Sequence, residues 1–92
     1  MDRLTQRMNN NYCVVNEKIN QNENGVTGEA IELLAKFENY YEDLVIKQEG
    51  IIKEMDKLKA ENKTSTVKFK QLLANKLTNS NNLLILKQFG IQ

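Results

Sequence analysis

The stretch from Ala30 to Asn62, AIELLAKFENYYEDLVIKQEGIIKEMDKLKAEN, decides the fold. Alternate steps of four and three residues from Ala30 meet mostly apolar or aromatic side chains, and the pattern runs on to Leu72. A seam of about six heptads is typical of a coiled coil rather than of a short amphipathic helix. We therefore expect a mainly α protein with one long helix over about residues 27–62, in an oligomeric coiled coil or helical bundle.

The residues on this seam form the predicted oligomer interface. Two of them, Gln48 and Asn62, are polar and occupy a positions, where each can hydrogen-bond to its own copy across a parallel two-stranded seam and so fix the register. Apolar neighbours of the seam widen the face, which suits a bundle, and parallel and antiparallel pairing both stay open. The interface residues are Leu34, Phe37, Tyr41, Leu44, Gln48, Ile51, Met55, Leu58 and Asn62.

Two continuations are possible beyond Asn62. Serine and threonine compete for backbone hydrogen bonds, so the polar cluster at residues 62–66 favours a break, after which residues 67–77 fold back as a second helix. In the alternative, the first helix continues to Leu77 and reaches about 50 residues, or about 75 Å.

The last part of the chain, residues 66–92, is expected to form one or two short basic amphipathic helices. Thr78–Asn82 reads as a turn in which Ser80 caps the following helix. Leu83–Phe89 then supplies a second apolar segment, and Gly90 is the expected C-terminal cap residue.

The first 25 residues predict a short β-hairpin and a linker. Arg3–Met8 alternates with a period of two, and Tyr12–Val15 is aromatic and β-branched, so the two segments can pair across the asparagine run between them. The alternative is a mobile arm. Asn16–Gly25 reads as the linker, and Thr27 is the expected N-cap of the long helix.

Composition limits the chemistry. The chain has 92 residues, no His, no Trp, no Pro and one cysteine, Cys13. It can form no internal disulfide and lacks the usual zinc ligands, and a chain of this length buries only about 60–65% of its unfolded surface. We expect Cys13 to be a small buried hydrophobe, the protein to use no cofactor or metal, and the function to be non-enzymatic.

No segment of the sequence predicts a membrane span. The longest aliphatic run is Leu83–Leu86, far below the roughly 20 residues that a span requires, and the N-terminus is polar. A single free cysteine also agrees with a reducing compartment. The expectation is a soluble, cytoplasmic protein that forms a single domain over residues 1–92.

Charge is unevenly distributed along the chain although the net charge is only +1. Residues 29–56 contain eight acidic and three basic side chains, whereas residues 57–92 contain seven lysines and one acidic residue, Glu61. The lysines can simply keep the surface solvated, or they can contact an acidic protein or a phosphate backbone. The candidate partner-binding residues are Lys63, Lys68, Lys70, Lys76 and Lys87.

Several short blocks of the sequence resemble a known class of proteins. The blocks are Met1–Arg7 (MDRLTQR), Ala30–Glu38 (AIELLAKFE), Lys68–Ala74 (KFKQLLA) and Phe89–Ile91 (FGI). They are similar to small uncharacterised phage and prophage proteins of low-GC Gram-positive bacteria, a class that includes inhibitors of host defence such as anti-CRISPR proteins. The resemblance implies no catalytic residues.

These observations predict a phage-encoded interaction protein that self-associates through its long helix. It would block a host protein, such as a CRISPR or other anti-phage defence component, in the host cytoplasm. One alternative is a nucleic-acid-binding accessory protein or regulator driven by the lysines, although the scarcity of arginine counts against base-specific contacts. Another is a purely structural coiled coil.

Overall fold

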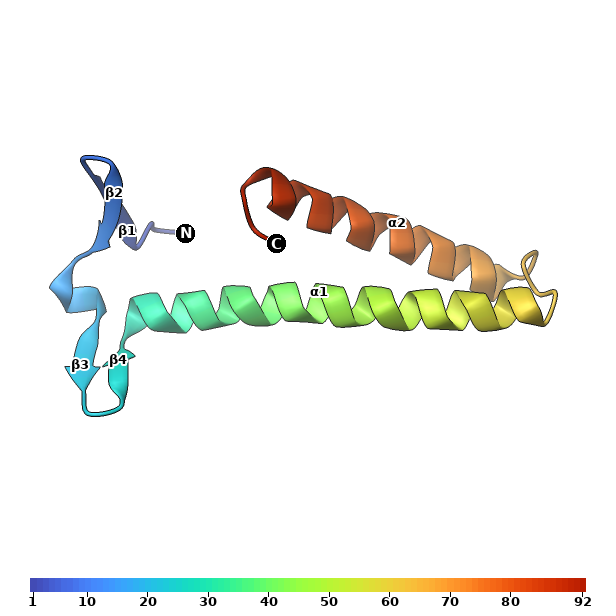
Figure 1. Cartoon of the computed structure of the whole chain (residues 1–92), viewed down its shortest axis with the longest axis horizontal. Helices are drawn as coiled ribbons and strands as arrows, with labels where there is room; N and C mark the ends of the chain where they lie inside the picture. The colour runs from blue at the N-terminus through green and yellow to red at the C-terminus, as the bar shows by residue number, and fades with distance from the viewer. The chain divides into compact units, whose positions relative to one another are not determined.

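The computed structural model describes all residues from 1 to 92 and is mostly helical (Figure 1). The chain divides into two compact units, Met1–Asn39 and Tyr40–Gln92. The elements, in chain order, are β1 (Thr5–Met8), β2 (Asn11–Val14), a 3₁₀ turn η1 (Asn16–Lys18), β3 (Asn20–Asn22), β4 (Gly25–Thr27), α1 (Glu29–Ala60) and α2 (Val67–Gln88).

The predicted N-terminal hairpin is confirmed. Strands β1 and β2 pair antiparallel, with Thr5 opposite Val14 and Met8 opposite Asn11. Asn9 begins the tight turn between them with a φ of 53°, a conformation that asparagine tolerates better than most residues.

The prediction of a linker at Asn16–Gly25 is wrong, because this segment folds into η1 and most of a second hairpin. Strands β3 and β4 pair antiparallel, and Asn22 lies opposite Gly25. The Asn22 side-chain oxygen Oδ1 accepts a hydrogen bond from the Asn24 backbone N–H at 2.9 Å. This local bond fixes the turn, so a polar segment without an apolar pattern becomes ordered.

Helix α1 begins at Glu29, one residue later than an N-cap at Thr27 would place its start. Thr27 lies in β4, and its hydroxyl donates to the Asn20 carbonyl at 3.4 Å. The first helical bond runs from the Glu32 N–H to the carbonyl of Gly28, whose φ is 123°. A Cβ at Gly28 would lie 2.7 Å from the carbonyl oxygen of Lys18, so only glycine fits between β4 and α1.

The favoured break after the long helix is confirmed, since α1 ends at Ala60. Asn62 adopts a left-handed φ of 58°. The Lys63 N–H donates to the Leu58 carbonyl at 2.8 Å, and the Asn62 N–H donates to the Lys59 carbonyl at 3.1 Å. This pair of bonds satisfies the last carbonyls of the helix and stops its propagation.

Helix α2 is one continuous helix, so the predicted turn at Thr78–Asn82 is wrong. Thr66 caps its start, where Oγ1 accepts a bond from the Phe69 N–H at 3.3 Å. Thr78 is accommodated within the helix because its hydroxyl donates to the Ala74 carbonyl at 3.1 Å. Gly90 follows the helix with a φ of 84°, as the predicted C-terminal cap residue requires.

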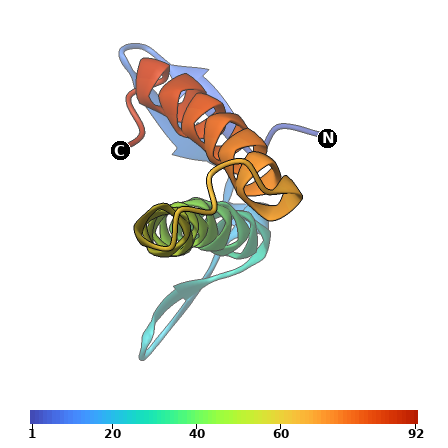
Figure 2. The ribbon, with the colours of Figure 1, turned by 90° about the vertical axis from the view of Figure 1, so that its right-hand side faces the viewer.

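The hydrophobic core lies between α1 and α2 in the second unit. Met55, Leu58 and Phe69 form a cluster, Ile51 and Leu72 pack against it, and Leu44 is also buried. Within this unit the two helices run antiparallel, lie nearest to each other beside their connecting loop and diverge toward the end of α2 (Figures 1 and 2). No side chain of the chain is completely buried.

Candidate protein-interaction surfaces

The first candidate surface lies on α1 in the second unit, and we call it the inner seam. It consists of the predicted interface positions Tyr41, Leu44, Gln48, Ile51, Met55 and Leu58. Tyr41, Gln48 and Ile51 are half-buried, and Leu44, Met55 and Leu58 are buried. Sequence periodicity therefore selected the correct face of α1, and α2 of the same chain covers it. Coverage by a second copy stays a prediction.

The remaining predicted interface residues have different surroundings. In the first unit, Leu34 is 52% exposed and Phe37 is half-buried. Asn62 lies after the end of α1 in its left-handed conformation, so in this conformation it occupies no helical a position.

The face of α2 that covers the inner seam follows the same heptad phase as α1. Counting on from Asn62 in the same steps reaches Ser65 and then the buried or half-buried residues of α2, namely Phe69, Leu72, Lys76, Asn79, Leu83 and Leu86. In the core cluster, the a position Met55 and the d position Leu58 of α1 pack together with the a position Phe69 of α2, and the d position Leu72 packs against them. Such mixing of a and d positions is expected when two heptad helices pack antiparallel.

Gln48 is the main polar contact across the inner seam. Its side-chain Nε2 donates to the Lys76 carbonyl oxygen at 3.2 Å and to the Ser80 hydroxyl oxygen at 2.6 Å. Its other amide atom, Oε1, is buried and accepts no hydrogen bond. The residue therefore fixes one register of α2 on α1 while leaving one polar atom unsatisfied.

Two of the candidate partner-binding lysines form ion pairs within the chain. Lys63 lies 3.0 Å from Glu61, and Lys68 of α2 lies 2.7 Å from Glu54 of α1. The hydrogen bond and charge of Glu54 raise the pKa of Lys68, and those of Lys63 lower the pKa of Glu61. All four side chains are substantially exposed, so each pair contributes little to stability.

The other three candidate lysines differ in how far they are exposed to solvent. Lys76 is half-buried on the inner face of α2. Lys70 and Lys87 are exposed and take part in no ion pair. Because α2 contains no acidic residue, these two lysines lie on a helix of uniform positive charge.

The second candidate surface, which we call the outer stripe, was not predicted. It consists of Lys70, Leu73, Leu77, Ser80, Leu84 and Lys87 on α2, and Ser80 lies at its edge, where the hydroxyl accepts a bond from Gln48 of α1. The spacing of three and four residues places these side chains along one helical face, and Leu73, Leu77 and Leu84 are 40%, 62% and 53% exposed. The same counting that found the inner seam finds this stripe when it is started at Lys70.

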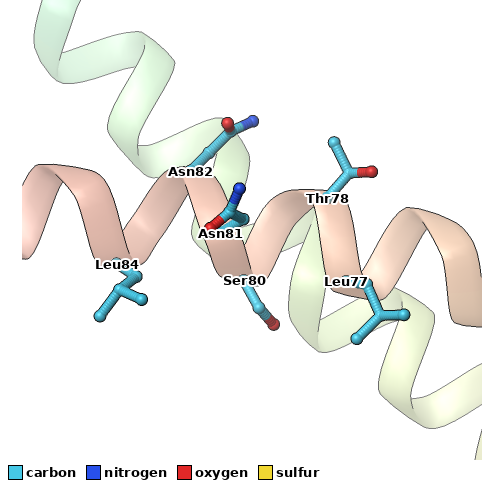
Figure 3. Close-up of a pocket in the computed structure, with 6 residues that line it drawn as sticks. All are labelled: Leu77, Thr78, Ser80, Asn81, Asn82 and Leu84. Carbon is cyan, nitrogen blue, oxygen red and sulfur yellow. The ribbon is translucent and has the colours of Figure 1, made fainter.

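The outer stripe includes an open hollow between two of its leucines. Figure 3 shows Leu77, Ser80 and Leu84 projecting from the same side of α2. Thr78, Asn81 and Asn82 complete the lining. A hollow with apolar ends and polar groups between them can accept a side chain from a partner protein.

The structure brings few chemically reactive groups together. Cys13 is half-buried in β2, and no three Cys, Asp or Glu side chains are grouped so that they could hold a metal ion. Neither helix has a stretch long and apolar enough to cross a bilayer.

Comparisons with protein-family models, curated proteins and solved structures gave no match to this chain.

Proposed function

We propose that this chain is a non-catalytic protein–protein interaction module that self-associates and binds an acidic partner protein. The observation that carries the partner-binding half is the outer stripe, in which exposed leucines lie between the unpaired Lys70 and Lys87 on a capped helix. Leu73, Leu77 and Leu84 follow the spacing of an amphipathic helix that inserts into a groove of its partner.

The energetics favour a protein over a small ligand. Burying an exposed leucine stabilises a complex by about 1.5–3 kcal/mol at most, so three partly exposed leucines supply several kcal/mol. Contacts across the inner seam already hold α2 in its helical form, which reduces the ordering cost of binding. The flanking lysines favour an acidic rim on the partner and speed its encounter.

Self-association is supported by the small size of the core. Only Leu44, Met55, Leu58 and Phe69 are buried, and further apolar side chains such as Ile46 and Phe89 are 65% and 80% exposed. So small a core supplies little of the free energy that folding requires, and a second copy would bury further apolar side chains such as these.

The partner class that we propose is a host protein of a phage-infected bacterium, in particular a component of CRISPR or another anti-phage defence. This part of the proposal is supported by the sequence resemblance described above and by the presence of a binding stripe without reactive groups. Binding the outer stripe would then block a surface that the host protein needs.

The test compares capture of host proteins by matched variants from a Gram-positive lysate. The double substitution Leu77→Asp and Leu84→Asp should reduce recovery of a specific partner at least tenfold, because it places charge in the stripe. Ile46→Asp is the control, since Ile46 is equally exposed but lies on α1. Equal recovery with both variants would rule out the outer stripe.

A second candidate function is binding to a nucleic-acid backbone. It is favoured by the unpaired lysines Lys70 and Lys87 and by the absence of acidic residues on α2. Lysine-driven affinity is greatest at low salt, so a shift assay at about 50 mM salt separates the two candidates. Failure to bind DNA or RNA there would leave the protein-binding proposal.

A further inference from the structure

We propose that the α1–α2 hairpin is the closed form of a chain that dimerises by exchanging α2. In the dimer, residues 61–66 become helical, and α2 of each copy packs on α1 of the other copy. This inference deepens the proposed function, because it depends on self-association and names the way in which it occurs.

The first observation is that one heptad phase runs through both helices and the loop. The seam positions of α1 and the inner face of α2 belong to a single series, and the loop residues Asn62 and Ser65 occupy the two intervening positions. A hairpin needs no such continuity, because its loop can connect two helices in any phase. A continuous helix does need it, because its seam must stay on one side along its whole length.

The second observation is that the contacts in the hairpin are those that an antiparallel pair of continuous helices would make. Met55 and Leu58 of α1 share one cluster with Phe69 and Leu72 of α2, so a and d positions of both helices meet, and exchange reproduces this cluster between copies. In the same register, Asn62 of one copy would face the partner's Ser65. This polar pair would form the central layer of the dimer.

The polar and charged contacts across the hairpin can be exchanged as well. Gln48 would donate to the partner's Ser80, and Glu54 would pair with the partner's Lys68, as both do within one chain. Only a second copy carries this particular combination of apolar, amide and charged groups in the correct order. It is therefore the occupant that fits the inner seam of an opened chain.

The third observation is that the closed form depends on a local feature of the loop. Asn62 at φ 58° and the two backbone bonds beside it terminate α1. No proline interrupts residues 61–66, so the loop can become helical once Asn62 leaves the left-handed region. Because exchange keeps the interhelical contacts, the loop conformation controls the balance between the closed and exchanged forms.

The decisive measurement is a filtered nuclear Overhauser experiment on mixed dimers of the full chain. One population is deuterated except for its ¹³C-labelled methionine methyl groups, so that its own Phe69 ring gives no signal, and the other is unlabelled and protonated. Exchange predicts a cross-peak between the labelled Met55 methyl group and the Phe69 ring of the unlabelled copy, because these residues belong to one core cluster. A dimer without this intermolecular cross-peak would overturn the exchange.

Substitutions at Asn62 give an independent test by sedimentation. Asn62→Ala should raise the dimer association constant by roughly tenfold, since alanine is disfavoured in the left-handed conformation and favoured in a helix. Asn62→Gly is the matched control and should lower the constant, since glycine is well accommodated in the left-handed turn.

These measurements distinguish exchange of α2 from self-association in general. A wild-type chain that stays monomeric at hundreds of micromolar would overturn self-association and the exchange together. A stable dimer that has the same association constant with alanine and glycine at residue 62 would overturn the exchange alone. A higher association constant with alanine and a lower one with glycine, together with the intermolecular cross-peak, would support the exchange.

Discussion

At the scale of single residues, Gln48 fixes the register of the two helices and at the same time lowers their stability. Its Nε2 bonds select one position of α2 along α1, but its buried Oε1 accepts no hydrogen bond. A buried acceptor without a donor lowers stability by about 1–3 kcal/mol relative to a satisfied one. Polar residues at an a position commonly combine this cost with a fixed helix register.

We therefore expect Gln48→Leu to raise the free energy of unfolding by about 1 kcal/mol, because an apolar side chain of similar size removes the unsatisfied oxygen. Urea unfolding followed by circular dichroism measures this change. Gln48→Ala is the control and should lower the free energy of unfolding by about 2 kcal/mol, because it leaves a space between the helices. A leucine variant less stable than wild type would show that the two Nε2 bonds outweigh the buried oxygen.

At the scale of secondary-structure elements, periodic apolar segments were predictable and polar ones were not. The heptad pattern predicted the face of α1 that is buried and nearly the correct ends of the helix. In Thr78–Asn82, weak helix propensity suggested a turn, but tertiary packing overrides propensity there. Asn79 and Asn82 are half-buried within a continuous α2.

The second hairpin had no apolar alternation that could predict it. Strands β3 and β4 consist of exposed residues, and side-chain bonds such as that of Asn22 to the Asn24 N–H order the turn. The dipeptide Asn24-Gly25 is a turn signal, and it lies where β3 is followed by β4. Its neighbours gave no sign of strand pairing, because a strand that buries neither face needs no particular pattern.

Gly28 connects the second hairpin to α1 and offers a test at this scale. We expect Gly28→Ala to destabilise the first unit by at least about 2 kcal/mol, because its φ of 123° is strained for alanine and the new Cβ would meet the Lys18 carbonyl at 2.7 Å. Amide hydrogen exchange in β3 and β4 measures this loss of stability.

The matched control is Gly50→Ala in the middle of α1, where an added Cβ meets no atom within 4 Å. Alanine should stabilise the helix there by up to about 1 kcal/mol. Equal effects of the two substitutions would contradict the steric role assigned to Gly28.

At the scale of the whole molecule, the small core limits stability. Four buried side chains serve a chain of 92 residues, and none is completely buried. The sequence predicted this shortage from length and composition and identified the inner seam as the stabilising face. It did not identify α2 as the element that covers the seam, because the heptad series beyond Leu72 meets the polar residues Lys76 and Asn79.

The outer stripe escaped prediction for a related reason. Leu73, Leu77 and Leu84 fit a helical period as well as the buried residues of α2 do, and a helical pattern alone does not say which of two adjacent faces is covered. Packing against α1 settles the question, because Phe69 and Leu72 are buried or half-buried while the three leucines stay exposed.

If self-association stabilises the fold, the melting temperature must depend on concentration. Raising the protein concentration from about 5 to about 500 µM should raise the melting temperature by several degrees, because mass action favours the associated native state. Thermal scans by circular dichroism at matched ionic strength test this expectation. Asn62→Gly should show a smaller rise, whereas a constant melting temperature for the wild type would argue for a monomer.

The six residues between α1 and α2 also determine the order of events after synthesis. A short tether holds α2 near α1 at an effective concentration in the millimolar range, and loops of about ten residues close within about 10–100 ns. Partner chains at micromolar concentration arrive far later. A newly made chain therefore closes on itself first, and exchange of α2 must proceed by reopening, so two labelled populations of closed chains form mixed dimers only as fast as the hairpin opens.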